Sequence, residues 1–163
     1  AYTVVPVAEK FSTVVTSAAG YPLDKTYYQT VKGMVGPMDI LKPGGNIIIA
    51  SECSEGMGSP EYVAAQRRLL ALGPEGFLAA IKGQKYAEID EWQTEMQLKP
   101  MRQGQIHLYT GGLEGDDRGL TGVEMIDSVE DAIAVSVAAS GDNRVAVMPE
   151  GPYVVPAYRP NAA

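Results

Sequence analysis

Three polar side chains early in the sequence could together bind a small anion. Residues 20–34 read GYPLDKTYYQTVKGM, and Tyr28, Gln29 and Lys32 fall within about one quadrant of a helical wheel. Lys32 would supply a positive charge and three donors, while Gln29 and Tyr28 would supply hydrogen bonds that can be oriented. This combination suits a carboxylate with an adjacent hydroxyl group. We also expect free backbone N–H groups at the helix start to attract the anion.

The same spacing is compatible with a structural interpretation. Tyr27, Val31, Met34 and Val35 form a normal core stripe on one side of the wheel. Lys32 could then be a solvated lysine and Tyr28 a half-buried packing residue, and the spacing alone does not decide between the two interpretations.

Strands and helices are predicted to alternate along the chain. The β-branched or apolar runs that predict strands are residues 11–17, 46–52, 105–112, 123–126 and 144–148, and LKPGG at 41–45 reads as a turn. The helices are predicted from capping residues and breakers at about 25–35 after Asp24, from Pro60 after Ser59, at 74–99 with a break at Gly83 and an end at Pro100, and at 129–139 between Ser128 and Gly141.

This order predicts the α/β class, as a three-layer Rossmann-like domain whose mostly parallel sheet is flanked by helices. Without an internal repeat or a linker, residues 1–163 are expected to form a single domain. In such a sheet the first turns of the helix that carries Lys32 would lie at the carboxyl ends of the strands, where ligands bind.

Charge and composition exclude several classes of partner. The chain has 13 Lys and Arg against 20 Asp and Glu, a formal charge of −7, so neither nucleic acid nor an anionic membrane would be held nonspecifically. No apolar run is long enough to span a bilayer. The single cysteine, Cys53, is compatible with a reducing compartment and favours the cytoplasm. The start AYTVV has neither a methionine nor a signal peptide, so we expect a piece of a longer protein.

Two blocks of the sequence resemble a known family. G-Y-P-L-D followed by Y-Q-x-x-K-G, and then LKPGGNIIIASECSEGMG, are similar to the C-terminal domain of the nickel-dependent lactate racemases. The resemblance implies that Tyr28, Gln29 and Lys32 face the active site. It also implies that Trp92, sixty residues after Lys32, lines this substrate-binding site. Alternatively, Trp92 belongs to a buried helical stripe with Ile89 and Met96.

The family's chemistry, as the resemblance implies it, requires parts that this chain lacks. The family uses a nickel-pincer nucleotide tethered to a lysine, which takes a hydride from the 2-carbon of a hydroxy acid, while two histidines act as acid and base. This chain has one histidine, His107. The catalytic, cofactor-binding and metal-binding residues are therefore expected in an N-terminal domain of the same polypeptide. The resemblance implies that this chain forms the side of the active site that faces a small 2-hydroxy acid substrate. The chain alone should therefore be inactive.

Three other features admit structural or functional interpretations. His107 alternates with apolar neighbours in a strand, and we interpret it as structural. Cys53 has no basic partner nearby in sequence and reads as a small buried residue. The loop Gly56-Met57-Gly58 could cradle a phosphate, although it lacks a full dinucleotide fingerprint. Two alternative functions therefore stay open: a Rossmann-like module that binds a nucleotide or phosphate, and an interface or regulatory domain without racemase activity.

Overall fold

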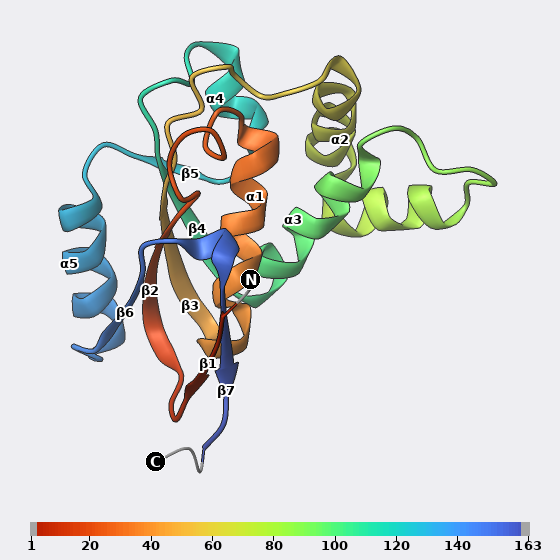
Figure 1. Cartoon of the computed structure of the whole chain (residues 1–163). Helices are drawn as coiled ribbons and strands as arrows, with labels where there is room; N and C mark the ends of the chain where they lie inside the picture. Colours follow the sequence, from red (N-terminus) through yellow and green to blue (C-terminus); the bar gives the residue numbers. More distant parts are fainter. Residues whose placement is uncertain (1–2, 161–163) are drawn as a thin grey trace.

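A five-stranded parallel sheet forms the centre of the molecule. The computed structural model describes residues 3–160 (Figure 1). The sheet has the order β5-β4-β3-β2-β6, and each neighbouring pair is parallel. Its strands are β2 (Phe11–Ser17), β3 (Leu41–Ala50), β4 (Gln105–Tyr109), β5 (Glu124–Ile126) and β6 (Val145–Met148). Because all five run in one direction, their carboxyl ends meet at one edge of the sheet.

Helices cover both faces of this sheet, which confirms the predicted α/β class. In Figure 1, α5 lies on one face, α1 and α3 lie on the other, and α2 packs outside α3. The helices are α1 (Tyr27–Val35), α2 (Pro60–Lys82), α3 (Glu91–Gln103), α4 (Asp116–Leu120) and α5 (Val129–Ser140), with 3₁₀ turns η1 (Gly36–Ile40) and η2 (Gly151–Tyr153). In the part of the chain from 3 to 160, no helix is both long and apolar enough to cross a membrane.

The apolar patterns of α1 and β3 explain the core. Tyr27, Val31 and Met34 recur at helical spacing and are fully buried against the sheet. In β3 the consecutive residues Ile47 and Ile48 are both fully buried, because a central parallel strand is covered on both faces. These buried residues fix the position of α1 over the sheet. Lys32 lies on another side of the helix and is exposed.

Glycine lets α1 lie directly on β2. A Cβ built on Gly33 would come within 2.7 Å of the Ser17 carbonyl oxygen and 3.0 Å of Ile49 Cδ1. A Cβ on Gly151, at the start of η2, would lie 2.4 Å from Thr16 Oγ1 and 3.3 Å from the Gly33 Cα. The backbones of β2, α1 and η2 therefore approach one another more closely than any side chain at these positions would permit.

Several predicted boundaries are wrong. Residues 41–45 belong to β3 rather than to a turn, and the β2–β3 register shifts between Phe11 and Thr13 to accommodate them. The N-cap of α1 is Thr26, not Asp24. By contrast, the predicted start of a new helical segment at Pro74 is confirmed, because the helical geometry of α2 is interrupted at Gly73, where φ is 69°.

The predicted helical end at Pro100 is also wrong. Helix α3 includes Pro100 and continues to Gln103. The side chain of Gln103 donates hydrogen bonds to the carbonyl oxygens of Met38 at 2.6 Å and Leu41 at 2.9 Å. These bonds hold the last turn in place beyond the proline, a tertiary effect that the local sequence does not contain.

A second, two-stranded sheet was not predicted at all. Strand β1 (Thr3–Val7) pairs in parallel with β7 (Val154–Tyr158), separately from the main sheet. Each strand contains a proline, Pro6 or Pro156, which argues against a strand when a sequence is read alone.

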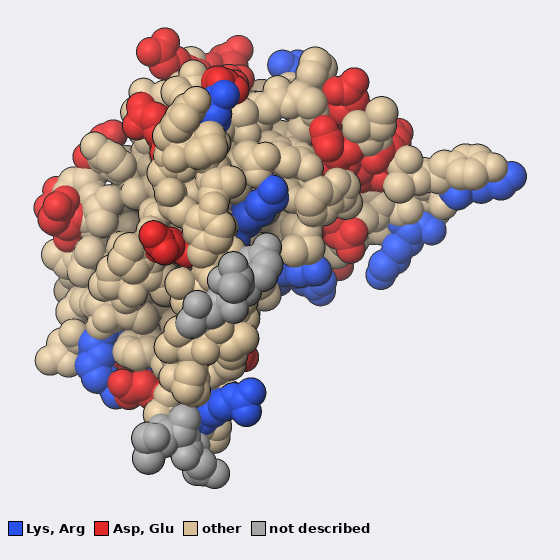
Figure 2. Space-filling model, viewed as in Figure 1, with Lys and Arg blue, Asp and Glu red and all other residues tan. Residues whose placement is uncertain are grey.

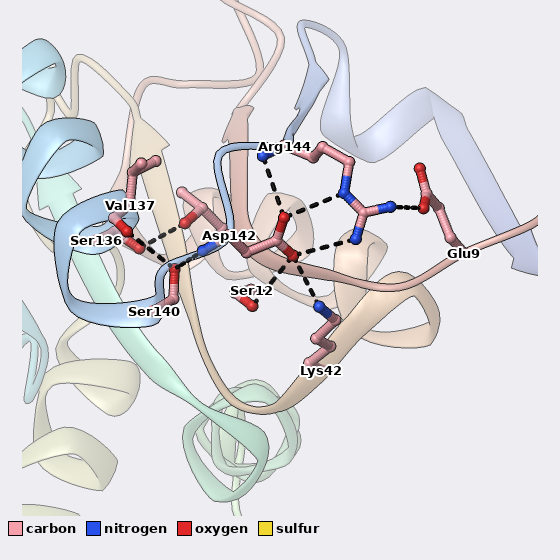
Figure 3. Close-up of polar contacts among 9 residues, drawn as sticks. Glu9, Ser12, Lys42, Ser136, Val137, Ser140, Asp142 and Arg144 are labelled. Carbon is pink, nitrogen blue, oxygen red and sulfur yellow. Dashed lines mark hydrogen bonds and ion pairs between the residues drawn. The ribbon is translucent and has the colours of Figure 1, made fainter.

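Ion pairs join the amino-terminal ends of the strands (Figure 3). The Asp142 carboxylate accepts hydrogen bonds from Lys42 Nζ at 2.7 Å and Arg144 Nε at 3.1 Å, and Arg144 also pairs with Glu9. Lys42 lies in β3, whereas Glu9 follows β1 and Arg144 precedes β6. The hydrogen bonds from Lys42 and Arg144 hold the pKa of Asp142 well below its ordinary value of 3.8.

We expect Asp142→Asn to lower the melting temperature at pH 7 and to reduce the loss of stability in acid. A carboxylate whose pKa is depressed by folding stabilises the fold above its unfolded pKa. This contribution is lost as the pH falls below 3.8 toward the folded value. Thermal melts of both proteins from pH 7 to pH 2 would test the expectation. Asp127→Asn is the matched control, because the Asp127 side chain is fully exposed and its Oδ1 lies 3.8 Å from Arg118 Nη2, too far for a hydrogen bond. Equal effects of the two substitutions would contradict it.

Candidate functional site

The carboxyl edge of the sheet contains a point where the strand order reverses. From β2 the chain proceeds through β3 and β4 to β5 on one side, and β6 then lies on the other side of β2. Ligands of open α/β sheets bind at such switch points, in the crevice beyond the carboxyl ends of the strands. Here the loop that leads from β2 into α1 and the turn η2 after β6 flank the switch point.

A hollow opens between these two segments. It has a volume of about 340 Å³ and lies between α1, α3 and η2. Its lining comprises Leu23, Val31, Lys32, Val35, Trp92, Gln93, Met96, Pro152 and Tyr153. This volume is within the range of small-molecule sites, roughly 300–1,000 Å³. Among these lining residues Lys32 is the only charged side chain, and no carboxylate faces it, so the hollow favours an anion.

The structure brings Tyr28, Gln29 and Lys32 together. Lys32 Nζ donates a hydrogen bond to Gln29 Oε1 at 2.6 Å and lies 5.9 Å from the centre of the Tyr28 ring. Lys32 is exposed, and the other two residues are half-buried. The shared helical side is therefore real, while the binding of a substrate by these residues stays a prediction.

Trp92 joins this group from α3. Its ring meets the Tyr28 ring edge-on, with the centroids 6.0 Å apart and the planes at 88°. Trp92 is 51% exposed and Ile89 is 70% exposed, so the alternative of a buried stripe is wrong. The reason is that α3 begins only at Glu91, which places Ile89 in the preceding loop.

The four side chains do not line a single cleft. Tyr28 lines a second hollow of about 440 Å³, together with Thr26, Glu55, Gly58, Ser59 and Asp90. Since Tyr28 lines one hollow, Trp92 lines the other and their rings are in contact, the two hollows are neighbours. The second hollow contains two carboxylates. Burial, and after it the charge of Asp90 and a hydrogen bond to it, raise the pKa of Tyr28 above its ordinary value.

The expectation of free amides at the start of α1 is wrong. The Tyr27 and Tyr28 N–H groups donate to the carbonyl oxygens of Gly56 and Met57, each at 3.0 Å, and the Gln29 N–H donates to Thr26 Oγ1 at 3.3 Å. The loop at 56–58 thus turns its carbonyl groups toward α1 and anchors the helix. Nothing in this arrangement favours the alternative of a phosphate cradle.

His107 and Cys53 lie away from this site. His107 faces α5, on the other side of the sheet from α1, where Nε2 lies 2.9 Å from Asn46 Oδ1 and Nδ1 lies 3.1 Å from Glu124 Oε2. Cys53 is fully buried, 3.4 Å from Thr30 Oγ1. The full burial of Cys53 agrees with a structural residue, whereas His107 lines a separate hollow of about 360 Å³ beside α5, so its structural role stays a prediction. Within residues 3–160, no group of three or more His, Cys, Asp or Glu side chains could hold a metal ion.

Sequence reasoning missed the contribution of η2. Pro152 and Tyr153 line the hollow opposite Lys32, and Gln93 and Met96 complete it from α3. The sequence contained part of the information needed to find Pro152 and Tyr153. The segment GPY follows the last predicted strand, so in a parallel sheet it must lie at the carboxyl edge.

Known proteins resemble this chain in both sequence and fold. Residues 7–155 match the profile of the family described as "Lactate racemase C-terminal domain". A lactate racemase from Thermoanaerobacterium thermosaccharolyticum is 28% identical over 150 residues, which are 87% of this chain and 34% of the relative. The solved structure of the lactate racemase apoprotein from that organism superposes with a TM-score of 0.79 at 24% identity, over 91% of this chain and 36% of the other. The chain spans about a third of the length of these relatives, and it belongs to the lactate racemase C-terminal domain family.

Proposed function

We propose that this chain is the substrate-facing domain of a 2-hydroxyacid racemase or epimerase that works with a nickel-pincer nucleotide. The observation that supports this most is the hollow at the switch point, where Lys32 is the only charged lining residue. In a chain with a net charge of −7, an anionic ligand needs such a locally placed cation. Membership of the lactate racemase C-terminal domain family supports small 2-hydroxy acids as the carboxylates that this site would bind.

The three residues of α1 would divide the recognition of the substrate among them. Lys32 would bind the carboxylate. Because Gln29 Oε1 already accepts a hydrogen bond from Lys32, the Gln29 amide group remains able to donate to the same carboxylate. Tyr28 would contact the hydroxyl group, and the indole of Trp92 would provide an apolar wall beside the substrate.

The nickel cofactor would be held by the N-terminal domain, which we propose as the partner of this chain in one polypeptide. The described residues of this chain do not fit a metal, since they provide no cluster of three ligands. When bound, the cofactor would supply a hydride acceptor for the 2-carbon. We further propose a cytoplasmic location, which is supported by a single, buried and unpaired cysteine.

We expect the full-length, cofactor-loaded protein to racemise lactate or a related 2-hydroxy acid, and this chain alone to be inactive and free of nickel. Chiral chromatography would measure the first property, and elemental analysis after dialysis the second. The assay should include several 2-hydroxy acids, because both walls of the cleft determine which side chain fits.

Two outcomes would count against the proposal. Absence of racemisation of every 2-hydroxy acid by a nickel-loaded full-length protein would refute the activity. About one nickel per chain in this domain alone would refute the assignment of the cofactor to the other domain.

A further inference from the structure

Asp90 has an unusual backbone conformation beside the proposed site. It is the N-cap residue of α3, with φ 60° and ψ 0°, in the left-handed region. An aspartate at this position normally has an extended backbone, and its side chain accepts a hydrogen bond from the first turn. The Asp90 side chain does not cap α3. The strain is thus not explained by the helix, and left-handed non-glycine residues of this kind concentrate at functional sites.

The Asp90 carboxylate is held in the second hollow instead. Ser59, the N-cap of α2, donates a hydrogen bond from its Oγ to Asp90 Oδ2 at 2.6 Å. Tyr28 and Asp90 line the same hollow, and the charge of Asp90 contributes to the raised pKa of the Tyr28 phenol. The strained backbone therefore places a carboxylate in the hollow that Tyr28 lines.

The Tyr28 ring has little freedom of its own. It meets the Tyr62 ring edge-on at a centroid distance of 5.2 Å and the Trp92 ring at 6.0 Å. Gln93 Nε2 donates to the Tyr28 carbonyl oxygen at 2.6 Å. The ring is therefore fixed on two sides. Rotation of the phenol O–H bond remains free, and a neighbouring carboxylate can determine its direction.

We propose that Asp90 is a positioning residue that engages the hydrogen of the Tyr28 hydroxyl group and so leaves the phenol oxygen to accept a hydrogen bond from the ligand. An ionised carboxylate only accepts hydrogen bonds, so Tyr28 must be the donor in this pair. The group that the phenol oxygen then recognises is a donor, namely the hydroxyl of a 2-hydroxy acid whose carboxylate is bound at Lys32. This inference rests on the proposed function for the identity of the ligand, but the Asp90–Tyr28 pair is independent of it.

The only tryptophan of the chain can report on this pair directly. Trp92 contacts the Tyr28 ring, and the absorption of a tyrosinate overlaps the short-wavelength side of tryptophan emission, so ionisation of Tyr28 at this short distance should quench Trp92. Fluorescence of this chain would be titrated from pH 8 to pH 12 in the wild type, Tyr28→Phe, Asp90→Asn and Asp90→Ala. We expect the Tyr28-dependent part of the transition to move to lower pH in Asp90→Asn, which loses the charge, and further in Asp90→Ala, which also loses the acceptor.

Asparagine tolerates the left-handed conformation, so Asp90→Asn should fold normally. Glu95→Gln is the matched control, because it removes one negative charge from the exposed surface of α3 and should leave the transition in place. The proposal is overturned if no part of the transition depends on Tyr28, or if that part has the same midpoint in Asp90→Asn as in the wild type.

A second measurement connects the pair with the ligand. In the full-length enzyme, Asp90→Asn should raise KM for lactate roughly tenfold and leave the inhibition constant of propionate, which keeps the carboxylate but lacks the hydroxyl, unchanged. A parallel change in both constants would indicate a merely structural role and would overturn the positioning role. An inactive wild type with a normal fluorescence shift would refute the proposed function while leaving the Asp90–Tyr28 pair intact.

Discussion

Lys32→Ala is expected to lower kcat/KM of the full-length protein for 2-hydroxy acids by roughly ten- to more than a hundredfold, without changing the melting temperature. A hydrogen bond to a charged group contributes about 1.5–3 kcal/mol, and this range corresponds to that loss of rate. The fold should be unaffected, because Lys32 is exposed on α1 and alanine is the best helix former.

Two further variants make the Lys32 experiment specific. Lys99→Ala removes another exposed helical lysine, on α3 and outside the hollow, and should leave activity unchanged. Lys32→Arg should recover only part of the activity, since a planar guanidinium replaces a compact ammonium next to Gln29. Racemisation rates and thermal melts would be measured for all variants. Unchanged rates in Lys32→Ala would return Lys32 to the interpretation of a solvated surface lysine, and a large drop in melting temperature would make it a structural residue.

Gly33→Ala is expected to destabilise the protein by about 1–3 kcal/mol, although the same substitution in an ordinary helix is stabilising. The added Cβ would lie 2.7 Å from the Ser17 carbonyl oxygen, which is backbone and cannot move aside alone. Helix α1 must then shift away from β2, and the adjacent Lys32 must shift with it. The melting temperature should fall by roughly 2–12 °C, and activity should fall further than the lost stability explains.

Gly119→Ala is the control for this substitution. Gly119 lies in α4, and a Cβ at this position would meet nothing within 4 Å. We therefore expect a neutral or slightly stabilising effect. If Gly33→Ala were as well tolerated as Gly119→Ala, the close contact between α1 and β2 would be disproved.

Local signals in the sequence were sufficient for much of the fold. The strand at 11–17 was predicted with its observed bounds, and the caps at Ser59 and Ser128 were predicted with their roles. These features depend on residues a few positions apart, where a side chain can reach the backbone group that it satisfies. The same holds for Tyr28, Gln29 and Lys32, whose proximity follows from one turn of helix.

Features that depend on distant residues could not be predicted. The exposure of Trp92 depends on where α3 begins. The side chain of Asp90, the N-cap residue, makes no capping hydrogen bond to α3 and instead accepts one from Ser59, a contact that the local sequence does not reveal. The occupied amides of α1 depend on carbonyl groups of the loop at 56–58. The pairing of β1 with β7 joins residues about 150 positions apart, as Thr3 and Val154 show.

That pairing has a mechanical consequence. Because β1 and β7 run in the same direction, with Thr3 beside Val154 and Val7 beside Tyr158, a force that separates Thr3 from Tyr158 pulls the two strands in opposite directions along their common axis. The hydrogen bonds between them are then loaded together in shear, whereas an antiparallel pair pulled in this way would open one bond at a time. Forced unfolding depends on the height of the unfolding barrier rather than on equilibrium stability. The two short strands outside the main sheet would therefore act as a clamp that protects the five-stranded sheet when the chain is stretched.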